Sequence, residues 1–236
     1  MPDRVRRSVE RFLTEGEGIR TRHSFSFGNH YDPANVGFGD LTAVNDEHID
    51  PASGYELHRH RDAEIVTWVL DGALAHADSA GNAGTITPGT IQRMNAGDGV
   101  EHSERNASAA AELRFIQMWL RSERTGTPRY QQASIADALA DGGWVLAASG
   151  HPDDDAAIDI ATDGARLWIA RMEPSERLTM PPGDLRHVHV VRGAVGLDDG
   201  AQLEAGDTLR LTSDAEHSLV AGSASELLLW AMRQSS

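Results

Sequence analysis

Residues 58–104 read HRHRDAEIVTWVLDGALAHADSAGNAGTITPGTIQRMNAGDGVEHSE, and the fold of the whole chain is best interpreted from this stretch. It opens with His58 and His60 and closes with His102 and Glu104, so each pair of metal-ligating side chains is separated by one residue. Residues i and i+2 of a β-strand point to the same face. If both pairs lie on strands of one barrel, three imidazoles and one carboxylate can converge on a single ion.

The whole chain has the composition and spacing of an all-β protein. The 23 glycines and 9 prolines of the chain separate short runs of Val, Ile, Leu and Thr, which is typical of many turns and short strands. Residues 112–120 alternate and place Phe115, Gln117 and Trp119 on one parity. The Ala-Gly-Asp-Gly sequence at 96–99 predicts a sharp bend directly before the second ligand pair. We therefore expect a sandwich or a barrel.

The composition excludes several kinds of site and partner. The 236 residues contain no cysteine, so disulfides, thiolate zinc sites and iron–sulfur clusters are excluded, and any metal must be held by His, Asp or Glu. The 36 Asp and Glu residues against 21 Lys and Arg argue against binding to a phosphate backbone. No stretch approaches the roughly 20 apolar residues that span a bilayer. We expect a cytoplasmic, soluble monomer that binds neither nucleic acid nor membrane, with residues 1–20 as a surface arm.

The second half of the chain repeats the β texture of the first. The predicted strand that ends at Gly193 in the second half corresponds to the one that ends at Gly72 in the first half. In the same way, the turn at residues 205–207 corresponds to the turn at residues 87–89. Counting from these landmarks, the positions of the four ligand candidates are occupied in the second half by Thr179, Pro181, Leu219 and Ala221. The repeat therefore predicts two tandem barrels, of which the second lacks the site.

The boundary between the two halves is expected near residue 125. Residues 121–130 are charged and contain glycine and proline, which makes them the candidate linker. We therefore predict an N-terminal metal-binding domain over residues 1–125 and a degenerate C-terminal domain over residues 126–236. A short helix is predicted just after the linker, with Ser134 as its N-cap and Ala140 near its end.

Three neutral imidazoles and one carboxylate suit a borderline divalent ion such as Fe(II), Cu(II), Ni(II), Mn(II), Co(II) or Zn(II). Four protein ligands leave positions open on an octahedral metal, so a substrate can bind directly. Either pair alone would be weak evidence, since the chain has 11 histidines and histidines are often structural or exposed. Together, in a duplicated β context with a glycine bend, the two pairs favour metal binding.

Other residues are rival or additional candidates. If residues 58–64 are extended throughout, Glu64 points to the same face as His58 and His60. It is therefore an alternative ligand, a group that orients an imidazole, or a residue that only caps the strand. His187 and His189 have ligand spacing and could cluster with His217, but they stand at the wrong end of their strand, which favours structural or surface roles. The unpaired histidines are expected to be structural or exposed: His23, His30, His48, His76 and His151.

Four motifs resemble those of the pirin family of bicupins, namely HRHRDAEI at 58–65, HADSAGN at 76–82, QRMNAGDG at 92–99 and HSE at 102–104. The segments SFSFG at 24–28 and YDP at 31–33 are similar to that family too. The C-terminal half resembles the family only in the spacing of its predicted strands and turns. The resemblance implies an all-β bicupin, with two tandem cupin barrels of the double-stranded β-helix or jelly-roll type. It also implies one metal in the N-terminal barrel, iron before the other ions, with ligands at His58, His60, His102 and Glu104 rather than Glu64.

The same resemblance implies quercetin 2,3-dioxygenase activity for several members and an iron-dependent role in transcription for others. The leading hypothesis is therefore a metal-dependent dioxygenase that cleaves a flavonol-like, hydroxylated aromatic substrate with dioxygen. Glu104, if it loosens from the metal, is the expected general base. The alternatives are an iron-sensing regulatory protein that acts through protein partners, and a bicupin with an unrelated small substrate. An apolar pocket that opens onto the metal would favour catalysis, and a closed site would favour sensing.

Overall fold

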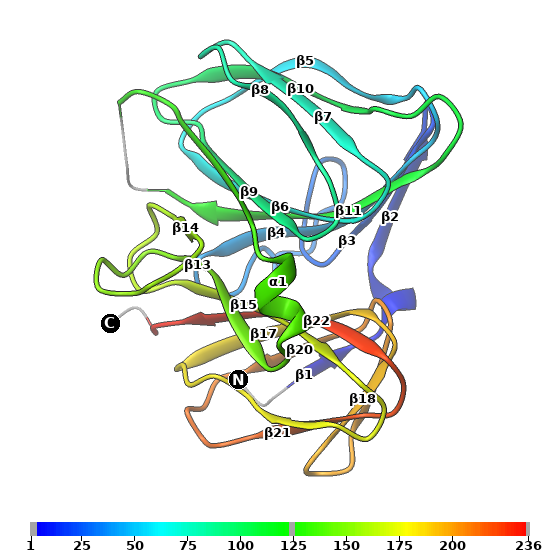
Figure 1. Ribbon diagram of the computed structural model, residues 1–236, viewed down its shortest axis with the longest axis vertical. Helices are drawn as coiled ribbons and strands as arrows, with labels where there is room; N and C mark the ends of the chain where they lie inside the picture. The colour runs from blue at the N-terminus through cyan, green and yellow to red at the C-terminus, as the bar shows by residue number, and fades with distance from the viewer. Residues whose placement is uncertain (1–3, 123–125, 235–236) are drawn as a thin grey trace. The chain divides into compact units, whose positions relative to one another are not determined.

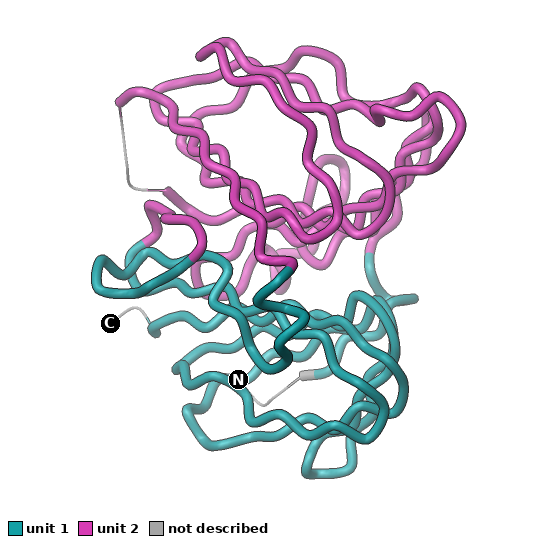
Figure 2. The backbone as a smooth tube through the Cα atoms, viewed as in Figure 1, with its two compact units in different colours: residues 1–11, 137–156, 163–236 teal, residues 12–136, 157–162 magenta. Residues whose placement is uncertain are grey.

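The computed structural model describes residues 4–122 and 126–234 (Figure 1). The chain forms two compact units (Figure 2): unit 1 comprises residues 1–11, 137–156 and 163–236, and unit 2 comprises residues 12–136 and 157–162. The boundary predicted at residue 125 falls on residues 123–125, which lie outside the described residues. No helix of the described ranges is long and apolar enough to span a membrane.

Unit 2 is a barrel of two antiparallel sheets. Its strands are β2 (Phe12–Gly16), β3 (Ile19–His23), β4 (Leu41–Ile49), β5 (Gly54–His60), β6 (Ala63–Asp71), β7 (Leu74–Asp78), β8 (Ala83–Ile86), β9 (Thr90–Asn95), β10 (Val100–Asn106), β11 (Leu113–Arg121) and β12 (Arg129–Ser134). The unit also includes the two-residue strand β14 (Ile158–Asp159), which belongs to neither of these two sheets. One sheet has the order β12-β9-β6-β11-β4-β3-β2, and the other has the order β5-β10-β7-β8. The two ligand pairs predicted from the sequence therefore lie on neighbouring strands, β5 and β10, of the smaller sheet (Figure 1).

The alternation along β11 determines which side chains face the inside of this barrel. Phe115, Gln117 and Trp119 share one face of the strand, as their parity predicts. Across the pairing with β4, Phe115 stands opposite Glu47 and Gln117 stands opposite Asn45. The same face of the larger sheet thus presents both apolar and polar groups to the barrel interior.

Two hydrophobic clusters fill the interior of unit 2. One consists of Ile49, Val69, Leu74, Ile86, Leu113 and Phe115, and the other consists of Ile65, Met94, Ala96 and Val100. Tyr55 packs against the first cluster and Trp119 packs against the second. These two aromatic residues also line a common pocket, so the polar site described below borders on both hydrophobic clusters.

A glycine bend leads into the strand that carries the second ligand pair. Gly97 has a φ of 48°, and a Cβ at this position would lie 2.1 Å from the carbonyl oxygen of Gly126. No side chain can be accommodated there without moving the backbone, so glycine is required at this position. The bend predicted at residues 96–99 is therefore confirmed, and it starts β10 at Val100.

Unit 1 repeats the same architecture with a different interior. Its elements are β1 (Arg4–Arg6), the 3-10 turn η1 (Ser8–Glu10), most of α1 (Ala136–Ala140), β13 (Trp144–Ser149), β15 (Arg166–Met172), β16 (Arg177–Thr179), β17 (Leu185–Arg192), β18 (Ala194–Leu197), β19 (Gln202–Glu204), β20 (Thr208–Leu211), β21 (Ser218–Ala221) and β22 (Ser225–Met232). Within this unit the sheets run β1-β20-β17-β22-β15-β13 and β16-β21-β18-β19, which matches the strand order of unit 2. The predicted duplication, the all-β class and the short helix are confirmed.

The second barrel has an apolar core where the first has its candidate ligands. His102 faces His58 across β10 and β5, whereas Leu219 faces Leu178 across the corresponding strands β21 and β16. Leu219 and Ala221 are buried in a continuous hydrophobic cluster of unit 1. A leucine pair therefore stands in place of a histidine pair, although the register puts Leu178 at the position of His58, one residue before the Thr179 that the sequence offsets predicted.

The histidines of unit 1 do not gather into a second centre. Val188 and Val190 of β17 belong to the hydrophobic cluster, so the alternating His187 and His189 point to the opposite face of the strand, where both are buried. His217 precedes β21, and these three histidines form no group that could hold a metal among the described residues.

The prediction of an N-terminal surface arm is wrong. Arg4 to Arg6 form β1, which pairs with β20, and Phe12 to Gly16 form β2, which pairs with β3. Arg7 also donates from Nη1 to Oδ2 of Asp207 at 2.7 Å. Short polar segments of this kind become strands because a sheet edge supplies their hydrogen-bond partners, and that edge is distant in sequence.

Candidate metal centre

Three histidines form the middle of the candidate site. His58 and His60 come from β5 and His102 comes from β10, and their ligand nitrogens lie within 4.8 Å of one another. The ring centroids of His58 and His102 are 4.4 Å apart, and those of His58 and His60 are 4.7 Å apart. Nδ1 of His58 donates to the carbonyl oxygen of Glu56 at 2.7 Å, which orients the ring and leaves Nε2 available as a ligand.

Glu104 follows His102 on β10 and is buried. It forms a second group with His76 and His102, whose ligand atoms also lie within 4.8 Å of one another. Gln117 donates from Nε2 to Oε2 of Glu104 at 2.8 Å, and Trp119 donates from Nε1 to Oε1 of Gln117 at 2.8 Å. The two groups share His102 and are together called the cluster here. Glu104 is grouped with His76 and His102 and not with His58 and His60, although these three residues line one pocket.

His76 is part of this cluster, although the sequence indicated only a structural or exposed histidine. It stands opposite Glu104 in the pairing of β7 with β10, and its ring centroid is 5.4 Å from that of His102. Nε2 of His76 lies 3.4 Å from Oδ2 of Asp78, and its ring stacks on Tyr130. The spacing of His76 and Asp78 is itself i, i+2, which is the signal that could have revealed this residue.

The histidine rings are kept neutral by their surroundings. Burial lowers the pKa of His58, and burial together with the neighbouring rings lowers the pKa of His60 to about 4 and that of His102 to about 3. Burial raises the pKa of Glu104 to about 7, although the hydrogen bond from Gln117 acts in the opposite direction. Neutral imidazoles are the form in which histidine binds metals.

Glu64 lies outside the cluster and has partners of its own. Asp62 has a φ of 55°, which interrupts the extended run between β5 and β6 on which the parity of Glu64 depended. Oε2 of Glu64 accepts hydrogen bonds from Nδ2 of Asn95 at 2.9 Å and from the backbone N–H of Ala161 at 2.7 Å. Oε1 lies 3.4 Å from Nε of Arg93. Glu64 therefore anchors a polar network that joins β6 and β9 to the segment at residues 157–162.

A pocket of about 200 Å³ opens onto the cluster. It is lined by Phe27, Asn45, Glu47, Tyr55, His58, His60, Glu104, Gln117 and Trp119. The Phe27 ring meets the Trp119 ring edge-on at 5.3 Å between centroids, and the Trp119 ring meets His60 edge-on at 4.8 Å. Phe27 and Tyr55 also line a second, wider pocket of about 610 Å³. Aromatic side chains therefore line both the pocket at the cluster and the larger pocket that shares Phe27 and Tyr55 with it.

Glu47 is a second carboxyl group in the pocket wall, and no motif in the sequence indicated it. It comes from β4, and its Oε2 accepts hydrogen bonds from Thr21 Oγ1 at 2.5 Å and from the Tyr55 hydroxyl at 2.8 Å. Burial raises the pKa of Glu47 to about 7, although both hydroxyl groups lower it and nearby Glu104 raises it.

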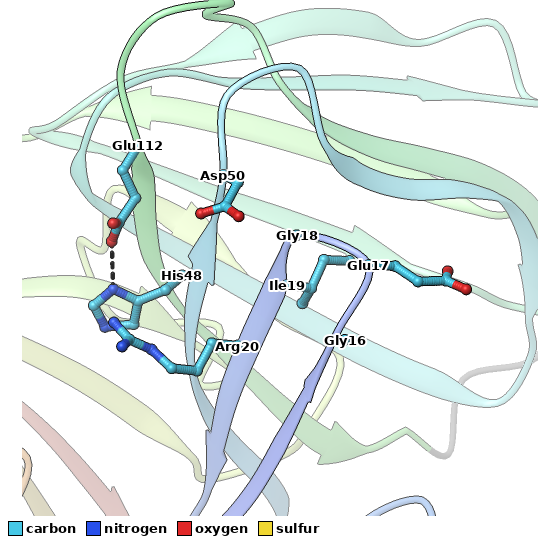
Figure 3. Close-up of a pocket in the computed structure, with 8 residues that line it drawn as sticks. All are labelled: Gly16, Glu17, Gly18, Ile19, Arg20, His48, Asp50 and Glu112. Carbon is cyan, nitrogen blue, oxygen red and sulfur yellow. Dashed lines mark hydrogen bonds and ion pairs between the residues drawn. The ribbon is translucent and has the colours of Figure 1, made fainter.

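A separate pocket of about 310 Å³ lies on unit 2 away from the cluster (Figure 3). Nδ1 of His48 bonds Oε1 of Glu112 at 2.5 Å, and Nε2 of His48 lies 3.5 Å from Asp46. Gly16, Glu17, Gly18, Ile19, Arg20 and Asp50 complete the lining. None of these side chains belongs to a group that could hold a metal among the residues described.

The fold and the cluster together define the class of protein: a bicupin in which one barrel carries His and Glu side chains that could hold a metal ion, whereas the described residues of the other barrel form no such group. The family model for pirin matches residues 4–120, and the model for the quercetinase C-terminal cupin domain matches residues 146–232. The chain belongs to the pirin family, as its motifs indicate.

Its relatives cover nearly its whole length. A Mycobacterium bovis protein provisionally named a quercetin 2,3-dioxygenase is 46% identical over 229 residues, which is 97% of this chain and 94% of that protein. An Escherichia coli protein named quercetin 2,3-dioxygenase is 33% identical and covers 96% of each chain. Among solved structures, the E. coli bacterial pirin YhhW in complex with nickel(II) is 32% identical, with a TM-score of 0.89 over 98% of this chain and 100% of that chain.

Proposed function

We propose that the chain is a metal-dependent dioxygenase of the quercetin 2,3-dioxygenase type that acts on flavonol-like, hydroxylated aromatic substrates. The observation that carries this proposal is the pocket whose aromatic walls lead to the His and Glu cluster. A planar substrate can pack against Phe27 and Trp119 while its hydroxyl groups reach the polar end of the pocket. The names of the M. bovis and E. coli relatives support the same type of reaction.

The residues of the cluster fit a divalent transition metal. Both ring nitrogens of buried His102 lack a hydrogen-bond partner within the described part of the chain, and a ligand bond would satisfy one of them. We propose His58, His60, His102 and Glu104 as the ligands. When bound, the metal supplies a Lewis acid and a redox centre for the reaction of the organic substrate with dioxygen.

Iron remains the ion that we expect first, and nickel is a rival because the E. coli neighbour was solved with nickel(II). Three imidazoles and one carboxylate suit both ions, as well as copper, manganese, cobalt and zinc. The identity of the metal therefore depends on a measurement of the purified protein.

The pocket residues position the reacting groups. Gln117 fixes the Glu104 carboxylate, and Trp119 fixes Gln117 in turn, so the carboxylate is oriented before any ion binds. Tyr55 and Trp119 join the pocket to the two hydrophobic clusters, so its polar end borders on apolar surroundings, which strengthen electrostatic interactions there.

The open pocket also supports an enzyme over a metal-sensing module. A sensor that acts through protein partners needs only a closed, coordinated ion, whereas this site includes a pocket of about 200 Å³, lined by Phe27 and Tyr55 beside His58, His60 and Glu104, that can receive part of a small molecule. In this proposal the N-terminal domain predicted over residues 1–125 carries the reaction. The domain over residues 126–236 is a degenerate barrel that retains the fold.

A quercetin assay tests the proposal. Metal-free protein is loaded separately with Fe(II), Cu(II), Ni(II), Mn(II) or Co(II), and loss of quercetin is followed in air together with oxygen uptake. We expect turnover with at least one ion, one dioxygen consumed per quercetin, and no turnover after His102→Ala. Absence of turnover with all five ions would contradict the proposed activity.

A further inference from the structure

The carboxyl group of Glu47 is held in the pocket wall with its two oxygen atoms in different situations. Oε2 accepts hydrogen bonds from the hydroxyl groups of Thr21 and Tyr55. Oε1 accepts no hydrogen bond from the described residues, and Glu47 lines the pocket that contains His58, His60 and Glu104. Because the other oxygen already accepts two hydrogen bonds, Oε1 is the atom of this pocket-lining carboxyl group that is left to meet a polar group of a bound molecule.

The other pocket carboxylate is committed to the cluster. Glu104 groups with His76 and His102, and Gln117 occupies one of its oxygens. Glu47 belongs to neither of the ligand groups found among the described residues. The pocket therefore contains two buried carboxyl groups in different environments, an arrangement that in enzymes separates two chemical roles.

We propose that Glu47, and not Glu104, accepts the proton of the substrate hydroxyl that ionises in the reaction. This inference rests on the proposed dioxygenase function. In the step, the substrate O–H bond breaks, its electron pair stays on the substrate oxygen, and the proton forms a new O–H bond at Oε1 of Glu47. Glu104 can then remain in the metal site throughout and does not have to dissociate in order to act as a base.

The surroundings of Glu47 suit a base that works near neutral pH. Two hydroxyl donors stabilise the carboxylate before transfer, and burial favours the neutral acid after transfer. Burial raises the pKa of Glu47 above the ordinary range of a glutamate, which is the direction that suits a base working near neutral pH. Tyr55 and Thr21 hold the group in place from β5 and β3, so little reorganisation accompanies the transfer.

The test compares Glu47→Gln with Glu104→Gln and the wild type, all metal-reconstituted. Three quantities are measured: metal content, the absorption spectrum of quercetin bound without oxygen, and kcat in air. The spectrum distinguishes neutral from ionised flavonol and does not depend on turnover. We expect Glu47→Gln to keep its metal, to bind quercetin in the neutral form, and to lose about 10²–10⁴-fold in kcat. Glu104→Gln should lose metal instead.

Two further variants keep the test decisive. Glu47→Asp should restore ionisation of the bound flavonol, wholly or in part. Tyr55→Phe removes a donor to Oε2 and should move the acid limb of the kcat/KM profile to higher pH, because the hydrogen bond from Tyr55 lowers the pKa of Glu47.

Ionised quercetin bound to Glu47→Gln, with kcat within threefold of the wild type, would overturn the assignment, and so would an unchanged profile in Tyr55→Phe. If the wild type ionises quercetin and Glu47→Gln does not, but neither turns over with any ion, the dioxygenase proposal fails while the role of Glu47 stands.

Discussion

Replacing Glu64 by alanine separates a structural carboxylate from the proposed ligands. Glu64 is fully buried and accepts hydrogen bonds from Asn95 and from the backbone of Ala161, while Arg93 lies 3.4 Å away. Because none of these partners belongs to the metal cluster, we expect Glu64→Ala to lower stability and to leave metal content unchanged.

The magnitude follows from the individual contacts. Each hydrogen bond to a charged acceptor contributes about 1.5–3 kcal/mol, so two of them give about 3–6 kcal/mol. Arg93 also donates to the Asp159 carbonyl and to Gln131, and Asn95 also donates to Ser122, whereas the backbone N–H of Ala161 loses its acceptor. Since these remaining bonds limit the damage, we expect a loss of about 3–4 kcal/mol in the free energy of unfolding.

The assay is urea unfolding of Glu64→Ala beside the wild type, with elemental analysis of both. Glu101→Ala, which removes an exposed carboxylate from β10, is the matched control and should change stability by less than about 0.5 kcal/mol. A Glu64→Ala protein that is as stable as the wild type but has lost its metal would refute the reasoning, since it would place Glu64 among the ligands.

Three other perturbations test separate parts of the structure. His76→Asn should weaken metal affinity about tenfold by removing a neighbour of His102 and Glu104, whereas His48→Asn should leave it unchanged; equal affinities in a metal titration would exclude a role for His76. Trp119→Leu should raise the Kd for quercetin about tenfold through loss of the aromatic wall, and an unchanged Kd by fluorescence titration would place the substrate elsewhere. Burial lowers the pKa of His187 well below 6.5, so the unfolded chain takes up more protons below that pH; stability should fall by up to about 1.4 kcal/mol per pH unit as the pH drops below 6.5, and this slope should be shallower in His187→Asn. Urea unfolding measured over a series of pH values gives this dependence. If the free energy of unfolding changed with pH equally in the wild type and in His187→Asn, His187 would not be held neutral.

The parts of the site that could be predicted from the sequence share one property, which is local spacing on a strand. The histidines at 58 and 60, the 102–104 pair and the 115–119 parity each need only the two-residue period of a β-strand, and all of them face the same interior. The duplicated barrel could be predicted for a similar reason, because glycine turns and strand rhythm recur at matching offsets.

The residues that were missed depend on pairing between distant strands. Glu47 becomes a pocket residue because β4 pairs with β3 and β11, and His76 joins the cluster because β7 pairs with β10. Strand pairing of this range is set by tertiary packing and not by local propensity. Glu64 was ambiguous for a different reason, since a positive φ at Asp62 changes the face on which the following residues lie.

Metal content tests the central claim most directly. Elemental analysis of natively purified protein is compared with that of His58→Ala, His102→Ala and Glu104→Ala, each checked for folding by circular dichroism. We predict about one equivalent of a divalent transition metal per wild-type chain and near-complete loss in each folded variant. Wild-type protein that neither contains nor takes up a transition metal, or a His102→Ala protein that keeps a full equivalent, would contradict the account.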